Sequence, residues 1–434
     1  MDLLKTNAAP KKNLVLYFQV HQPKRLSNLR FFDIGASHPV YYNDMDREII
    51  ERVSHENYLP TNKLLLKLIK KNPEIRLSFS LSGVIMEQLE RYAPEVLLSF
   101  RQLAETGAVE FLSETYYHSL ACMLPGKEFE IQVLKHAEKL YQHFGVRPSV
   151  FRNTELIYND EIGKKISRLG YLGVITDGVE RVLQGRTPNH VFQHPEQENL
   201  KILLRNYRLS DDIAFRFSSE GKILTSDKYL SWLNGLPSHE EVITLGMDYE
   251  TFGEHQKKET GIFKFLEEIL TKLAKSNTFQ LMTPSQAVIA TKAQSILNVP
   301  YFISWADQER DLSAWLGNEM QRDAFDTLQA LEFDVKNTND PAILETWRNL
   351  QTSDHLYYMS TKKGGDGTVH NYFSPYPSPY EAFINYMNVL TDFTMRVKIA
   401  KAGNTVFHDT HPAKAEVERQ VQAVGTRMTM LSTH

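Results

Sequence analysis

A single cysteine, Cys122, occurs among the 434 residues, so the chain cannot form an intramolecular disulfide. Proteins without disulfides are typical of reducing compartments. The N-terminal stretch MDLLKTNAAPKKN also lacks the apolar segment that a secretory signal contains. These two absences predict a cytoplasmic protein.

Long apolar runs and a strong net charge are missing as well. No stretch approaches about 20 consecutive apolar residues, which is the length that a membrane-spanning helix needs. The formal net charge is −4, without the basic stripe that usually contacts nucleic acid. We therefore expect neither a membrane nor a nucleic acid as a partner, and the oligomeric state stays open.

Several catalytic and cofactor motifs are absent. The sequence contains no GxSxG, no P-loop, no CxxC, no HExxH and no glycine-rich dinucleotide fingerprint. Its histidines do not follow a metal-ligand spacing. These absences set aside the enzyme classes that the motifs mark.

Short apolar segments alternate with amphipathic segments through the first two-thirds of the chain. Strands are predicted at residues 14–20, 75–81, 109–112, 149–152, 171–176, 201–204, 242–245 and 279–282. Helices are predicted at 64–70, 84–104 with a break near Pro94, 127–144 ending at Gly145, 161–169 and 262–273. This alternation predicts a parallel sheet covered by helices, either a closed barrel or an open doubly wound sheet.

Beyond about residue 295 the strand signals fade. Helices are expected at 312–335, 341–351, 378–397 and 414–430, with a glycine-rich loop at 362–367. The sequence therefore divides into an α/β unit, residues 1–294, and a mainly helical C-terminal region, residues 295–434.

Polar side chains follow several of the expected strands. They are His21, Glu114, Glu155, Asp177 and Asp248. In a parallel barrel, and equally in an open doubly wound sheet, active-site groups gather at the carboxyl ends of the strands. We expect some of these side chains to share one site.

Glu155 ends the segment FRNTE. A carboxylate fixed at the end of a strand could attack a substrate carbon, and nearby Arg152 would favour its ionised form. An ordinary helix-capping glutamate would give the same pattern.

The segment TLGMDYETFGEH, residues 244–255, carries Asp248, Glu250, Glu254 and His255 after an apolar strand. Crowded carboxylates raise one another's pKa, as a general acid requires near neutral pH. A solvated acidic turn and a divalent-metal site are the alternatives.

Two further segments mix acids with aromatic residues. VEFLSETYYH contains Glu114 and His118, and suits either a sugar subsite or a buried, hydrogen-bonded strand end. QTSDHLYYM contains Asp354, which could bind sugar hydroxyls or cap a helix. The stretch before it contributes Trp305 and Trp315.

Taken together, HQP after the first strand, GAVEFLSETYYHSLA, FRNTELIYND, GMDYETFGEHQ and QTSDHLYYM resemble glycoside hydrolase family 57, in the order that the family has them. The resemblance is greatest to its α-amylase-like members. It implies a distorted (β/α)7 barrel followed by a helical region that contributes to the cleft. It also implies an enzyme that acts on α-glucans with retention of configuration.

The resemblance assigns roles to individual residues. Glu155 matches the nucleophile and Asp248 the general acid/base. His21 and His118 match positions that line the sugar pocket, and Glu250 and Asp354 match supporting acidic positions near the substrate. Glu114, His255 and Trp315 are predicted to bind substrate as well, from the segments in which they occur. The sequence departs from many members at Phe151 and Arg152, where a tryptophan usually precedes the nucleophile motif.

The implied reaction is hydrolysis of α-1,4-glucans by double displacement, without a metal or cofactor. A 4-α-glucanotransferase or glycogen branching enzyme on the same scaffold is one alternative. A glucan-binding protein with low turnover is another. A metal-dependent hydrolase or deacetylase that uses Asp248, His255 and His21 is the third.

Overall fold

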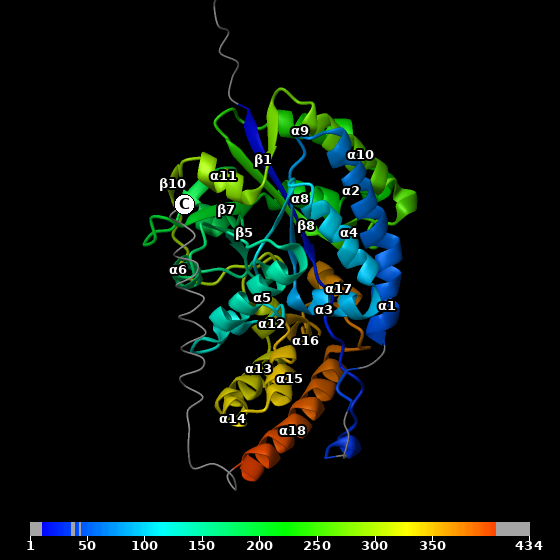
Figure 1. Ribbon diagram of the computed structural model, residues 1–434, viewed down its shortest axis with the longest axis vertical. Helices are drawn as coiled ribbons and strands as arrows, with labels where there is room; N and C mark the ends of the chain where they lie inside the picture. The colour runs from blue at the N-terminus through cyan, green and yellow to red at the C-terminus, as the bar shows by residue number, and fades with distance from the viewer. Residues whose placement is uncertain (1–10, 36–39, 43–44, 405–434) are drawn as a thin grey trace, which may run out of the picture.

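A computed structural model describes residues 11–35, 40–42 and 45–404. Its strands lie in the upper part of Figure 1 and its C-terminal helices lie below them. The strands are β1 (Lys12–Val20), β2 (Leu77–Leu81), β3 (Val109–Phe111), β4 (Val150–Arg152), β5 (Gly173–Asp177), β6 (Val191–Gln193), β7 (Lys201–Arg205), β8 (Val242–Asp248), β9 (Phe279–Met282) and β10 (Ser295–Ile296).

Seven of these strands form a closed parallel barrel. β8 pairs with β1, β1 with β2, β2 with β3, β4 with β5, β5 with β7, and β7 with β8. A parallel bridge between Ser113 and Phe151 closes the remaining gap between β3 and β4. The predicted (β/α)7 barrel is therefore confirmed, and the open sheet is excluded.

The barrel is distorted because its strands pair unequally. β1 and β8 run in register from Asn13↔Val242 to Gln19↔Asp248. In contrast, β7 and β8 pair only at Arg205↔Thr244, and β3 meets β4 only at the Ser113 bridge. Outside the ring, β6 lies antiparallel to β7, β10 pairs with β6, and β9 pairs with the beginning of β1.

Helices cover the outside of the barrel. They are α1 (Met45–Val53), α2 (Leu59–Lys71), α3 (Gly83–Tyr92), α4 (Pro94–Ala104), α5 (Glu128–Phe144), α6 (Asp160–Arg168), α7 (Glu180–Leu183), α8 (Tyr207–Ala214), α9 (Ser226–Asn234), α10 (Ile262–Ala274) and α11 (Pro284–Ala290). The predicted break at Pro94 is confirmed, because Pro94 begins α4. The predicted stop at Gly145 is also confirmed, with a left-handed φ of 68° that glycine adopts without strain.

The interior of the barrel is filled by side chains and leaves little room for a larger side chain. Tyr17 of β1 lies directly against Gly246 of β8, its register partner. A Cβ at position 246 would come within 2.0 Å of the Tyr17 ring. This glycine therefore lets a buried tyrosine cross the barrel just before β8 reaches Asp248.

The C-terminal region is helical, as predicted. Its helices are α12 (Ser313–Leu316), α13 (Glu319–Ala330), α14 (Glu332–Asn337), α15 (Pro341–Asn349), α16 (Ser353–Tyr357), α17 (Gly364–Phe373) and α18 (Pro379–Asn404). The helix expected at 414–430 lies outside the described residues. The loop predicted at 362–367 is confirmed only for residues 362 and 363, because α17 starts at Gly364. His370 holds this helix, and its ring stacks on Tyr357 with centroids 3.7 Å apart.

The boundary at residue 294 stays a prediction. β10 lies just beyond it and pairs with β6. One hydrophobic cluster also joins Phe151 and Val174 of the barrel to Trp315 and Tyr386 of the helical region. Within the described residues, no helix combines the length and apolar character needed to cross a membrane.

Candidate active site

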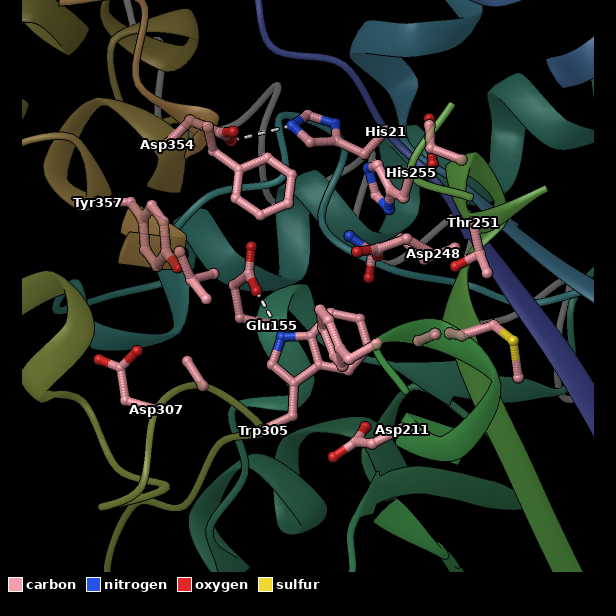
Figure 2. A pocket seen from close by; sticks show the side chains of 18 of the residues that line it. His21, Glu155, Asp211, Asp248, Thr251, His255, Trp305, Asp307, Asp354 and Tyr357 are labelled. Atoms are coloured by element: carbon pink, nitrogen blue, oxygen red, sulfur yellow. Dashed lines mark hydrogen bonds and ion pairs between the residues drawn. The ribbon is translucent and has the colours of Figure 1, made fainter. Parts of the chain in front are cut away.

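The carboxyl ends of the strands open into a pocket of about 390 Å³. Figure 2 shows acidic and aromatic side chains converging on it from both the barrel and the helical region. Of the predicted site residues, those that line it are His21, Glu155, Asp248, Glu250, His255 and Asp354. Segments more than 300 residues apart in sequence thus meet in one cavity.

Glu155 lies in a short helical turn, Thr154–Leu156, directly after β4. Its backbone is left-handed, with φ 55° and ψ 23°. An ordinary residue pays about 1–3 kcal/mol for such a conformation, and residues of this kind cluster at active sites. The turn aims the carboxylate into the pocket rather than along the strand.

Two donors hold the Glu155 carboxylate. The indole Nε1–H of Trp305 donates to Oε2 at 2.6 Å, and the imidazole Nε2 of His118 lies 3.1 Å from Oε1. His118 itself has a left-handed φ of 50°. Each carboxylate oxygen thus has its own partner, and this arrangement suits an ionised, fixed carboxylate.

His118 connects Glu155 with a second acid. Its Nδ1 lies 2.8 Å from Oε2 of Glu114, whose other oxygen accepts a 2.8 Å hydrogen bond from Ser80. Burial alone would lower the pKa of His118, but the hydrogen bonds to Glu114 and Glu155 outweigh it and raise the pKa to about 10. Burial alone would raise the pKa of Glu114, but the His118 hydrogen bond outweighs it and lowers the pKa to about 2. His118 is therefore an imidazolium between two carboxylates at neutral pH.

Asp248 is the last residue of β8. Burial, followed by the negative charge of Glu155, raises the pKa of Asp248 to about 6. Burial and the charge of Asp248 raise the pKa of Glu250 to about 8, and the Tyr58 hydroxyl donates a hydrogen bond to Glu250. The site thus holds one carboxylate supplied with donors and two acids that favour protonation.

His21 and Asp354 join the barrel to the helical region. Nε2 of His21 lies 3.0 Å from Oδ2 of Asp354, and its Nδ1 lies 2.7 Å from the Ser82 hydroxyl. The His21 ring stacks on His118 with centroids 3.9 Å apart. Asp354 of α16 is therefore fixed at the pocket wall opposite Trp305 (Figure 2).

A group of charged residues was missed by the sequence interpretation. Arg205, at the end of β7, pairs with Asp211 and lies 3.3 Å from Asp177. Arg310 also pairs with Asp177. Arg205, Asp211 and Arg310 line the pocket. Because Arg205 is a polar residue at a strand end, the rule that selected Glu155 could have found it.

Three predicted residues do not line the pocket. Glu114 and His118 are fully buried behind Glu155. Trp315 is also fully buried, and its ring lies 6.1 Å from that of Tyr357, which does line the pocket. Trp305, which was not predicted to bind substrate, lines the pocket instead. The two tryptophans belong to the same segment, and no periodic signal distinguishes them.

One group of acids has metal-like spacing within the described residues: Asp307, Glu309 and Asp366. The group does not contain Asp248, His255 or His21, which the metal-dependent alternative would use. The Lys362 ammonium lies 2.8 Å from Asp307 and 2.6 Å from Glu309. Lys362 thus already pairs with two of the three acids.

Comparisons with known proteins identify the family. The sequence profile of Glycosyl hydrolase family 57 matches residues 15–300. A protein of Methanocaldococcus jannaschii named "Putative alpha-amylase" is 42% identical over 397 residues, which cover 88% of this chain and 84% of that protein. The match thus spans the barrel and most of the helical region.

Solved structures share the fold at low sequence identity. A branching enzyme of Thermococcus kodakaraensis has a TM-score of 0.64 and 11% identity, over 90% of this chain and 94% of that one. A 4-alpha-glucanotransferase of Thermococcus litoralis has a TM-score of 0.64 and 15% identity, over 80% of this chain and 56% of that one. The profile match and the 42% identical relative show that this chain belongs to Glycosyl hydrolase family 57.

Proposed function

We propose that the protein is an α-amylase-type enzyme that hydrolyses α-1,4-glucans with retention of configuration. In this proposal Glu155 is the nucleophile and Asp248 is the general acid/base. The coarser statement, a glycoside hydrolase or transglycosylase of α-glucans, follows from the family and from relatives named as amylases and glucanotransferases.

The observation that carries the proposal is the contrast between the two carboxyl groups that share the pocket. Glu155 accepts hydrogen bonds from Trp305 and from the cationic His118. Asp248 has its pKa raised to about 6 by burial and by the charge of Glu155. A carboxylate held by two donors, beside a carboxyl whose pKa is raised, is the arrangement that a double displacement uses.

In the first step, Glu155 attacks the anomeric carbon while Asp248 donates its proton to the departing glycosidic oxygen. The C–O bond to the leaving sugar breaks as the bond to Glu155 forms. The product is a covalent glycosyl-enzyme and a free chain end. His118 and Trp305 hold the attacking carboxylate in one orientation, which favours a near-attack geometry.

In the second step, Asp248 is a carboxylate and accepts a proton from water. The resulting oxygen attacks the anomeric carbon and releases Glu155, which restores the original configuration. If a sugar hydroxyl replaces water, the same step transfers the chain instead of hydrolysing it. Transferase activity is therefore the second candidate, favoured by the relatives named as glucanotransferases.

The helical region forms one wall of the cleft in this proposal. Asp354 and Tyr357 of α16 line the pocket, as do Asp366 and Val369 of α17. His21 and Asp354, linked at 3.0 Å, are placed to bind the hydroxyls of the sugar next to the scissile bond. The region from 295 onward is thus proposed to complete the catalytic unit of residues 1–294.

The test is product analysis on maltooligosaccharides and starch for the native protein and the Glu155→Gln variant. Glu161→Gln is a matched control, because Glu161 is an exposed acid on α6 only six positions away. Shorter sugars from the native protein and the control, with none from Glu155→Gln, would support hydrolysis. Longer or branched products would move the assignment to a transferase.

Three other results would contradict the proposal. Equal activity in Glu155→Gln would remove Glu155 from the mechanism. Absence of product from the native protein would favour the low-turnover glucan-binding alternative. Inactivation by a chelator, reversed by a divalent cation, would favour the metal-dependent alternative.

A further inference from the structure

Three aromatic rings at the mouth of the pocket are exposed although large apolar side chains are usually covered. Phe215, the residue after α8, is 58% exposed, and Phe373, the last residue of α17, is 38% exposed. Both line the pocket. Tyr372, 62% exposed, lies edge-on to Phe373 with centroids 5.0 Å apart. Exposed apolar groups beside a cleft commonly mark a ligand-binding surface.

Packing does not explain Phe215. Two positions later, Phe217 is fully buried and its ring lies 5.3 Å from Phe265 in the core. The turn after α8 thus directs one phenyl ring inward and the other to the pocket. α8 is firmly held, because Asp211 pairs with Arg205 and the Tyr229 hydroxyl donates a 3.0 Å bond to the Leu209 carbonyl.

The end of α17, which carries Phe373, is held by several contacts. Near the end of α17, His370 lies 3.1 Å from Oδ2 of Asp307, and its ring stacks on Tyr357. The Phe373 ring contacts His255 at 5.6 Å between centroids. Rings held in this way lose little conformational entropy when a ligand covers them.

One loop, residues 252–256, links the two rings. Its Gln256 side chain donates a 3.1 Å hydrogen bond to the Ala214 carbonyl, beside Phe215. Its His255 contacts Phe373 and Tyr372. The same loop follows Asp248, so the rings are placed by the segment that carries the proposed general acid/base.

We propose that Phe215 and Phe373, supported by Tyr372, form an outer binding platform for the part of an α-glucan chain that extends beyond the catalytic pocket. The inference rests on the proposed function and adds the substrate's length to it. The apolar C–H faces of pyranose rings stack on aromatic rings. The enzyme is therefore specific for chains long enough to reach past the mouth, and short oligosaccharides do not use the platform.

The test compares kcat/KM for maltotriose and maltoheptaose in Phe215→Ala, Phe373→Ala and the double variant. Loss of both platform rings is expected to reduce kcat/KM for maltoheptaose by about tenfold and to leave maltotriose nearly unchanged. Phe215→Trp should retain the preference for the longer chain. Phe333→Ala is the control, since Phe333 is 75% exposed on α14 and does not line the pocket.

Binding of maltoheptaose by calorimetry, in the Glu155→Gln background, separates this inference from the proposed reaction. Weaker binding by the platform variants supports the platform even if the native enzyme shows no turnover. Equal loss for both substrates, or unchanged binding of maltoheptaose, overturns it. If the Glu155→Gln protein with both platform rings intact binds no maltooligosaccharide, both the platform and the proposed function are overturned.

Discussion

Trp305 holds Glu155 through two hydrogen bonds. Its indole Nε1–H donates to the carboxylate at 2.6 Å, and its backbone N–H donates to the Glu155 carbonyl at 3.3 Å. The guanidinium groups of Arg152 and Arg205 lie 5.0 and 5.3 Å from the same indole ring. A residue from outside the seven barrel strands thus fixes the conformation of the proposed nucleophile, which has a left-handed backbone.

Replacing this indole tests its positioning role. Trp305→Phe removes the donor to Glu155 and keeps an aromatic ring in the wall. Because a hydrogen bond to a charged group is worth about 1.5–3 kcal/mol, kcat should fall about ten- to hundredfold, with little change in KM. Steady-state kinetics on maltoheptaose measures this. Trp232→Phe, on α9, should behave like the native enzyme, and an unchanged kcat in Trp305→Phe would contradict the role.

The pKa of Asp248 predicts the alkaline side of the pH–rate profile. The proposed acid must be protonated to donate, and its pKa is raised to about 6. Activity should therefore be retained below this pH and decline as pH rises above it, with kcat/KM losing about tenfold per pH unit. Initial rates between pH 4 and 9 give the profile. A plateau that continues to pH 9 would rule out Asp248 as the acid.

The chemistry of the leaving group provides a separate test of Asp248. Asp248→Asn cannot donate a proton, so it should cleave maltooligosaccharides far more slowly than the native enzyme. Fluoride departs without a proton, so glycosyl-enzyme formation from α-maltosyl fluoride should be largely retained. Fluoride release and the burst of product report this step. Equal losses on both substrates would contradict the acid role.

The Glu114–His118 pair predicts how stability depends on pH. The pKa of His118 is raised from 6.5 to about 10, so its contribution is complete below 6.5 and is lost as pH rises through 10. The pKa of Glu114 is lowered from 4.5 to about 2, so its contribution is complete above 4.5 and is lost as pH falls through 2. Urea unfolding across this range should show both losses in the native protein.

A double-mutant cycle isolates that pair. Glu114→Gln removes one of the two carboxylates that hold the His118 imidazolium, while Glu155 remains 3.1 Å away. Loss of this charged hydrogen bond should cost about 1.5–3 kcal/mol of unfolding free energy at pH 6. The double variant Glu114→Gln/His118→Gln should cost less than the sum of the two single variants. Additive losses would show that the two side chains are not coupled.

Gly246 should not tolerate a side chain. In Gly246→Ala the new Cβ would meet the Tyr17 ring at 2.0 Å, and the buried ring cannot move without displacing β1. We expect a loss of unfolding free energy of about 1–3 kcal/mol or more, together with reduced kcat because Asp248 lies two residues ahead. Gly365→Ala, where nothing lies within 4 Å, is the control. Equal unfolding midpoints would contradict the packing argument.

The sequence predicted the strands and their carboxyl ends well, because buried parallel strands are continuous apolar runs that stop at polar residues. Glu155, Asp248 and His21 could be placed in one site by this rule alone. Barrel closure could not be derived from the pattern, because it depends on one bridge at Ser113. The pattern was equally compatible with an open sheet.

The helical region was harder to interpret. Trp305 and Trp315 belong to a segment without clear periodicity, and their opposite environments depend on tertiary contacts. α17 begins in a glycine-rich stretch that favours a loop by propensity. The His370–Asp307 link and the stack on Tyr357 hold this helix against the pocket, and neither contact has a local signal.

The unequal pairing of the barrel strands affects what sets the spacing of the two proposed catalytic carboxyl groups. The single pairs at Ser113↔Phe151 and Arg205↔Thr244 divide the ring into two arcs, β4–β5–β7 and β8–β1–β2–β3. Glu155 follows the first arc and Asp248 ends the second. The spacing between the two carboxyl groups therefore depends on the backbone pairing at these two positions and on the core side chains that both arcs share.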